Sequence, residues 1–219
     1  MIRLRVVGLA LVVVFAMSAM VASAASAALP EFSTSSTFKA SSGHALLETK
    51  AGHKVECSAS TGEGTITAPK SVTKASVKFT GCKEPEIGAT CSSGSKSGEI
   101  VTKMLAGTLK YINAGAKEVG IELKPESSTE KVFVTFKCEI FGFGSTLTVR
   151  GSLTGKITPV NTKTNTYTLA YTQSKGKQTY PSESLLETES SGIVSFPYEE
   201  SGQEVSATVI TSTVGEIKA

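Results

Sequence analysis

The stretch KVFVTFKCEIF, residues 131–141, alternates apolar and polar residues with a period of two. Successive side chains of a β-strand point to opposite faces, so this alternation predicts a half-buried strand and not a helix. One predicted face carries Val132, Val134, Phe136, Cys138 and Ile140, and the other carries Phe133, Thr135, Lys137 and Glu139.

The same alternation continues on both sides, in short runs separated by Gly, Ser, Thr, Asn and Pro. About ten strands are predicted, two of them joined as a hairpin over Lys50-Ala51-Gly52, and this spacing predicts an all-β protein with an antiparallel β-sandwich or barrel-like fold. Residues 99–112 would also suit a short helix, although Gly107 favours a bend between two strands. Besides 132–140, the predicted strands cover residues 44–49, 53–58, 75–80, 99–112, 119–123, 146–157, 166–172 and 205–214.

Two stretches rich in Ser, Thr, Lys and Gly, residues 33–43 and 173–191, are predicted to be loops or mobile edges. The expected organisation is a flexible segment over residues 28–43 followed by a single β-rich domain over 44–219. The segments that begin at Gly64 and Gly155 resemble each other, which suggests two similar halves. The alternative, that all strands rich in Thr, Lys and Val look alike, stays open.

The N-terminal residues have the layout of a secretory signal peptide. Arg3 and Arg5 precede an uncharged apolar stretch with small residues at its end, and this stretch is predicted to be helical. Cleavage is expected after Ala27, or after Ala24, which makes residues 1–27 the signal and leaves no membrane span in the exported product. The predicted location is extracellular or associated with the cell envelope.

Four cysteines, Cys57, Cys82, Cys91 and Cys138, lie in the exported part. An even number in an oxidising compartment predicts two disulfides. Cys82 and Cys91 bracket a short turn, so the expected pairs are Cys82–Cys91 and Cys57–Cys138. A Cys/His metal site is not expected, because His53 and Cys57 are not accompanied by a CxxC or HxxxH spacing.

Composition excludes several kinds of chemistry. All 19 acidic residues are Glu, and Trp does not occur. Without Asp the chain can form no Ser-His-Asp triad, EF-hand loop or aspartyl dyad. Removal of Arg3 and Arg5 with the signal would leave 20 basic residues against 19 acidic ones, a net charge of +1 with no basic run, so nucleic-acid binding is not expected.

The remaining catalytic candidates are weak, and no cofactor is predicted. Ser71 with Lys74, and Ser93 with Lys96, have the Ser-x-x-Lys spacing of penicillin-interacting enzymes, but no Lys-Thr-Gly follows. A pair of Glu residues in a cleft could hydrolyse a glycosidic bond, but the sequence does not indicate which two would meet. Along residues 118–122 Glu is expected on the solvated face. His44 and His53 flank the predicted hairpin as exposed turn residues.

Six segments within residues 52–161, in order, resemble a group of uncharacterised exported proteins of high-GC Gram-positive bacteria. The resemblance implies a secreted β-rich protein and supplies no activity and no functional residues. The segments are GHKVECSASTGEGTI, VKFTGC, CSSGSKSGEIVTKMLAGTLKYI, VGIEL, FKCEI and GSLTGKITPVN.

Two functions of different class follow. The first is a non-catalytic module outside the cell that binds a cell-wall polymer or a surface protein, or has a structural role. The second is a secreted hydrolase that uses paired Glu residues or a Ser-Lys arrangement. The near-neutral charge and the lack of a nucleophile, acid and base set favour the first.

Overall fold

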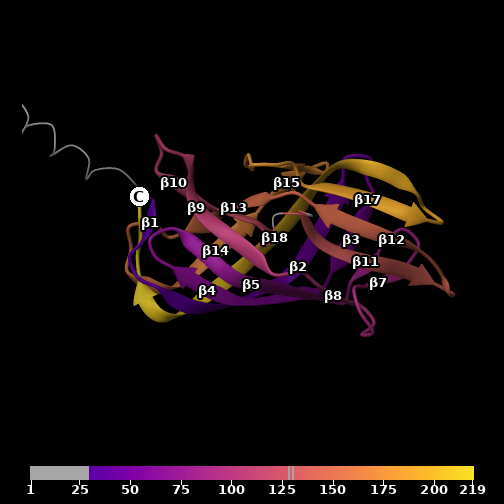
Figure 1. Ribbon diagram of the computed structural model, residues 1–219, viewed down its shortest axis with the longest axis horizontal. Coiled ribbons are helices and arrows are strands. Elements are labelled where there is room, and N and C mark those ends of the chain that lie inside the picture. The colour runs from indigo at the N-terminus through magenta and orange to yellow at the C-terminus, as the bar shows by residue number, and fades with distance from the viewer. Residues whose placement is uncertain (1–29, 128, 130) are drawn as a thin grey trace, which may run out of the picture.

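The computed structural model describes residues 30–127, 129 and 131–219, so the predicted signal peptide lies outside the described residues. The described chain is all-β and antiparallel, as predicted, and contains no helix (Figure 1). Its nineteen strands exceed the expected ten because long runs are divided and two-residue strands are included. They are β1 (Glu31–Phe32), β2 (Ser36–Thr49), β3 (Lys54–Cys57), β4 (Ala59–Thr67), β5 (Ser71–Thr80), β6 (Lys83–Glu84), β7 (Ala89–Ser92), β8 (Glu99–Val101), β9 (Leu105–Asn113), β10 (Glu118–Pro125), β11 (Val132–Ile140), β12 (Phe143–Arg150), β13 (Leu153–Thr158), β14 (Thr164–Tyr171), β15 (Gln173–Ser174), β16 (Lys177–Gln178), β17 (Glu187–Gly192), β18 (Phe196–Gly215) and β19 (Ile217–Lys218).

The main sheet closes on itself twice, because β2 pairs with β18 as well as with β3 and β4. The first closed ring, here called the first barrel, runs β2-β4-β5-β9-β10-β13-β14-β18. The second barrel runs β2-β3-β6-β7-β11-β12-β17-β18. The two barrels therefore share the β2–β18 ribbon and occupy the two halves of an elongated molecule (Figure 1).

The shared ribbon overturns the prediction of a loop at residues 33–43 and of a flexible segment reaching to residue 43. Ser36–Thr49 is one strand of 14 residues, and its first part pairs with β4 on one side and β18 on the other. Phe38 and Ala40 pack against the core between polar neighbours. The apolar–polar alternation of this segment is weak, because Phe38 and Ala40 are its only inward apolar residues and the residues around them are mostly small and polar.

Two other predicted strands are each divided in the structure. Residues 99–112 form no helix; they form β8 and β9, interrupted at residues 102–104 and not at Gly107. Residues 146–157 belong to β12 and β13, which are separated by a turn at Gly151, where φ is +111°. Residues 173–191 are mostly irregular, but they contain β15 and β16 and end within β17.

The alternating stretch KVFVTFKCEIF forms β11, and its inward residues Val134, Phe136 and Cys138 are buried as predicted. Phe133 was predicted on the outer face but is also buried. The register with β12 shifts between Val132 and Val134, which is a β-bulge. A bulge places two consecutive residues opposite one partner residue, so the strict alternation fails at this point.

The four cysteines lie on four neighbouring strands in the order β3, β6, β7, β11, with Cys82 immediately before β6. The disulfides are Cys57–Cys82 and Cys91–Cys138. The predicted pairs, Cys82–Cys91 and Cys57–Cys138, are wrong. The two disulfides are consistent with an extracellular or oxidising environment.

Strand geometry explains the observed pairing. The Cys91 N–H donates to the Cys82 carbonyl at 3.0 Å, and hydrogen-bonded antiparallel pairs are the more widely spaced ones. In both bridged pairs the Cα atoms are 4.0 Å apart. The β6–β7 hairpin is therefore linked covalently to the strand on each side and not across its own turn.

Tryptic peptides of the unreduced protein should show this connectivity directly. Cleavage after Lys83 separates Cys82 from Cys91, so we expect peptide 55–70 linked to 79–83 and peptide 84–96 linked to 138–150. Mass spectrometry before and after reduction measures both links. A species that links 79–83 to 84–96 would contradict the structure.

Candidate functional site

The residues singled out in the sequence do not come together in one site. His44 is exposed, with its Nε2 atom 3.8 Å from a Glu56 carboxylate oxygen. Ser93 accepts a hydrogen bond from the Val101 N–H at 2.8 Å, and Lys96 is paired with Glu99 at 2.9 Å. These contacts connect a surface turn to β8, and the Ser-Lys hypothesis gains no support from them.

Ser71 and Lys74 lie on β5, where Lys74 has a positive φ of 51° next to a register shift. Four hollows of the described residues each contain one glutamate: Glu63 in two of them, and Glu84 and Glu126 in the others. A glycosidase needs two carboxylates in one cleft. None of these four hollows supplies such a pair, and the paired-Glu hydrolase stays a prediction.

Among the described residues, Glu122 on β10 is the most buried glutamate, although it was expected on the solvated face. A strap formed by residues 180–186 covers it. The Glu122 carboxylate accepts hydrogen bonds from the Lys110 ammonium at 2.7 Å, from the Ser152 hydroxyl at 2.9 Å and from the Glu183 backbone N–H. Because a distant segment supplies the cover, the local sequence carries no signal of this burial.

Glu122 holds the strap and is not poised for acid–base chemistry. Burial by itself would raise the pKa of the Glu122 carboxyl, but the hydrogen bonds from Glu183, Lys110 and Ser152 outweigh it and hold the pKa below its ordinary value. Ser152 is itself buried and also accepts a hydrogen bond from the Ser184 N–H at 3.0 Å. We infer a structural clasp for the strap from these contacts.

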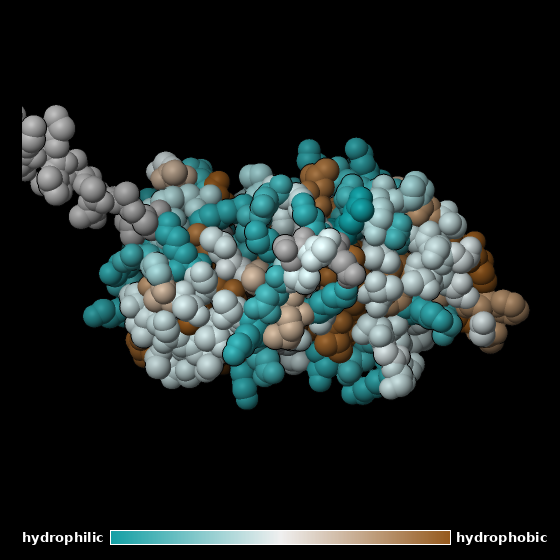
Figure 2. All heavy atoms as spheres, in the orientation of Figure 1, coloured by the Kyte–Doolittle hydropathy of each residue, from teal (hydrophilic) through white to brown (hydrophobic). Residues whose placement is uncertain are grey.

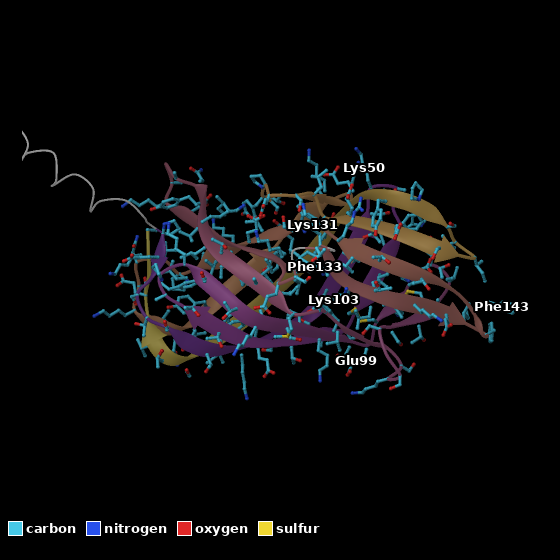
Figure 3. The ribbon with its side chains drawn as sticks, viewed as in Figure 1. Lys50, Glu99, Lys103, Lys131, Phe133 and Phe143 are labelled. Carbon is cyan, nitrogen blue, oxygen red and sulfur yellow. A yellow bond between two sulfur atoms is a disulfide. The ribbon has the colours of Figure 1, made fainter. Side chains whose placement is uncertain are left out.

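At one end of the second barrel, five apolar side chains from three different loops are exposed. This group, here called the apolar tip, comprises Ile87 between β6 and β7, Phe141 and Phe143 at the β11–β12 turn, and Ile193 and Val194 between β17 and β18. Figure 2 shows hydrophobic side chains gathered at this end, and Figure 3 places Phe143 there, far from Lys103 and Phe133 at the middle of the molecule.

Phe141 is the most unusual residue of the apolar tip. It is 92 % exposed and has a φ of +52°. Ile140 pairs with Phe143, so Phe141 and Gly142 form a two-residue turn with positive φ at both positions, where Asn-Gly is the favoured sequence. A positive φ is strained for a bulky residue, and an exposed apolar side chain is unfavourable in water. Phe141 therefore carries both costs in the free protein.

Hydrogen bonds join the β17–β18 loop of the apolar tip to the start of β12. The Val194 N–H donates to the Ser145 hydroxyl at 2.9 Å, and the Ser190 hydroxyl donates to the Val194 carbonyl at 2.7 Å. These bonds hold the β17–β18 loop beside the start of β12. Ile193 and Val194 are therefore presented on a preorganised backbone.

Beneath the tip, the mouth of the second barrel forms a hollow of about 90 Å³, here called the tip hollow. Ile87, Phe143, Ile193 and Val194 line its rim, while Leu47, Val55 and Leu147 line its interior. His53 forms part of the wall and stacks on the Phe196 ring, with 4.5 Å between ring centroids. The hollow has the size and lining to accept a small apolar group.

Most charges near the apolar tip are acidic, and Lys54, which lines the tip hollow, is paired with Glu48 at 3.6 Å. Glu84 and Glu86 lie in the loop of Ile87, and Glu139 lies two residues before Phe141. Burial raises the pKa of the Glu84 carboxyl, and the nearby Glu86 raises it further, while His53 opposes this. Within residues 84–88, 139–144 and 191–195 there are three Glu and no Lys or Arg.

No family model, curated protein or solved structure matches the chain. Among residues 30–127, 129 and 131–219, no three His, Cys or Glu side chains are grouped so that they could hold a metal ion. The described part of the chain also contains no helix with the length and hydropathy of a membrane span. The geometry of the apolar tip is thus the principal basis for a functional proposal.

The clasp predicts an acid-dependent loss of stability. Glu122→Gln removes a charged acceptor of three hydrogen bonds, and we expect it to lower the free energy of unfolding at pH 7 by about 2 kcal/mol. A carboxyl whose pKa is lowered in the folded state stabilises above its unfolded pKa, and this contribution is lost as the pH falls through the folded pKa. The deficit of the variant should therefore shrink below pH ~4.5.

Urea denaturation between pH 3 and pH 7 measures this effect. Glu118→Gln is the matched control, because Glu118 lies on the same strand and pairs with Lys156, but both side chains are about one third exposed. The free energy of unfolding of Glu118→Gln should fall by less than about 1 kcal/mol. Equal losses in the two variants at pH 7 would contradict the clasp.

Proposed function

We propose that this is an exported, non-catalytic module that binds another protein of the cell envelope or the extracellular medium through its apolar tip. The observation that carries the proposal is Phe141, a solvent-exposed aromatic side chain on a turn with positive φ. Such a residue is unfavourable in the free protein, so a role in binding explains it better than a role in stability. The two disulfides and the N-terminal sequence support export.

The chemistry of the apolar tip favours a protein partner over a cell-wall polymer. Phe, Ile and Val side chains offer no hydrogen bonds to the many hydroxyl groups of a polysaccharide. An apolar side chain of a protein could instead enter the tip hollow, as anchor residues do at the centre of many interfaces. The rim around Phe143 and Ile193 would exclude water from this contact.

The acidic rim favours a protein over an anionic membrane. Glu86 and Glu139 stand close to the exposed apolar residues, and their carboxylates would be repelled by anionic lipid headgroups. A partner with an apolar centre and a basic rim would complement both features. We also propose that the chain belongs to a family of exported proteins of high-GC Gram-positive bacteria.

Binding of the purified protein to washed envelopes of the cells that produce it tests the proposal. The double variant Phe141→Ser, Phe143→Ser should reduce the affinity at least about tenfold, because exposed aromatic anchors carry a large share of binding energy. Val214→Ser is the matched control, since Val214 is 63 % exposed on β18 but lies outside the tip. Its binding should equal that of the unmodified protein.

Three further arms identify the class of partner. Protease treatment of the envelopes should abolish binding, whereas vesicles of phosphatidylglycerol and purified peptidoglycan should not retain the protein. Rising salt should weaken binding, because the rim is acidic. Retention by vesicles or by protease-treated envelopes, or equal loss in the Val214 control, would overturn the proposal.

A further inference from the structure

A second hollow lies among the core side chains and borders the tip hollow, with which it shares Leu47 and Val55. It measures about 170 Å³ and extends along the shared ribbon through both barrels. Protein interiors are packed as densely as organic crystals, and few voids exceed the size of a water molecule. This hollow, here called the barrel cavity, is larger than an engineered apolar cavity of about 150 Å³ that binds benzene.

The lining of the barrel cavity is mostly apolar. Phe38, Ile121 and Leu169 of β2, β10 and β14 are representative, together with Val55, Phe136 and Val149 of β3, β11 and β12. An apolar void of this size does not hold stable water, because water needs two to four polar partners. The lining therefore indicates an apolar occupant. Polar side chains enter the lining at Ser60, Glu63, Ser76, Thr102 and Gln203.

Among the described residues that line the cavity, Tyr171 is the one whose polar atom, its hydroxyl, is buried without a hydrogen-bond partner. The ring lies against Gly155, where an added Cβ would come within 2.7 Å of it, so its position is fixed by packing. Burial also raises the pKa of the Tyr171 phenol, which keeps the hydroxyl protonated and able to donate.

A buried hydroxyl without a partner is unfavourable, and native proteins seldom retain one without a reason. Tyr167 on the same strand shows the usual solution, because its hydroxyl donates to the Thr164 carbonyl at 3.2 Å. We propose that the barrel cavity binds a compact aromatic or alicyclic molecule with a single oxygen or nitrogen atom, and that this atom forms a hydrogen bond with the Tyr171 hydroxyl.

Two probes that differ by one hydroxyl test the proposal. Titration calorimetry should show that p-cresol and toluene both bind the full mature protein. Tyr171→Phe should weaken p-cresol binding about fivefold, the effect of one neutral hydrogen bond, and should not weaken toluene binding. Tyr167→Phe is the matched control and should change neither affinity.

Stability supplies a second readout that does not depend on a ligand. Tyr171→Phe removes an unpartnered hydroxyl, so its melting temperature should equal or exceed that of the unmodified protein. Tyr167→Phe removes a hydrogen-bonded hydroxyl and should melt about 2–4 °C lower. A lower melting temperature for Tyr171→Phe would mean that the hydroxyl already has a partner and would overturn the proposal.

The location of the probe is tested by NMR and by filling the cavity. Methyl resonances of Leu169 and Val209 should shift on addition of p-cresol, and those of Leu147 in the tip hollow should not. Ala207→Leu places extra volume against the lining and should abolish binding of both probes. If this variant does not fold, the comparison of Tyr171→Phe with Tyr167→Phe still decides the question. Absence of binding at millimolar probe, or equal weakening in both tyrosine variants, would overturn the proposal.

Discussion

Ten residue pairs between β2 and β18, from Thr49 with Ser201 to Phe38 with Thr211, close both barrels at once. Each barrel is an open sheet until this ribbon forms, because β2 supplies one edge and β18 the other in both rings. Closure removes the unpaired strand edges that otherwise favour aggregation. It also joins segments about 160 residues apart, and contacts of such long range form slowly in folding.

The row of cysteines reinforces the barrel that carries the apolar tip. The β6 and β7 strands are short, and β3 meets β6 through the single pair Glu56 with Lys83. Backbone pairing alone would leave this wall of the second barrel weak. The Cys57–Cys82 and Cys91–Cys138 bridges link β3, the β6–β7 hairpin and β11 in one covalent series, which positions the Ile87 loop next to the β11–β12 turn.

Three side chains have an unusual exposure: Glu122 and the Tyr171 hydroxyl are buried, and Phe141 is exposed. Glu122 is buried, but three hydrogen bonds satisfy its carboxylate, and the strap explains why it is there. Phe141 is exposed and Tyr171 is buried without a partner, and neither arrangement has a compensating contact among the described residues. In the proposals above, we assign an external partner to each of these two residues.

The sequence alone determined the strand-rich, antiparallel character of the protein, because a period of two in apolar residues is a local property that survives any arrangement of the strands. It also predicted correctly that Val134, Phe136 and Cys138 face inward and that the cysteines form two bridges. Only the tertiary structure decided that Ser36 to Gly43 is a strand, which cysteines pair, that Glu122 is covered, and that three separate loops bring Ile87, Phe143 and Ile193 together. Each of these depends on the register between segments far apart in the chain, and a local pattern carries no information about that register.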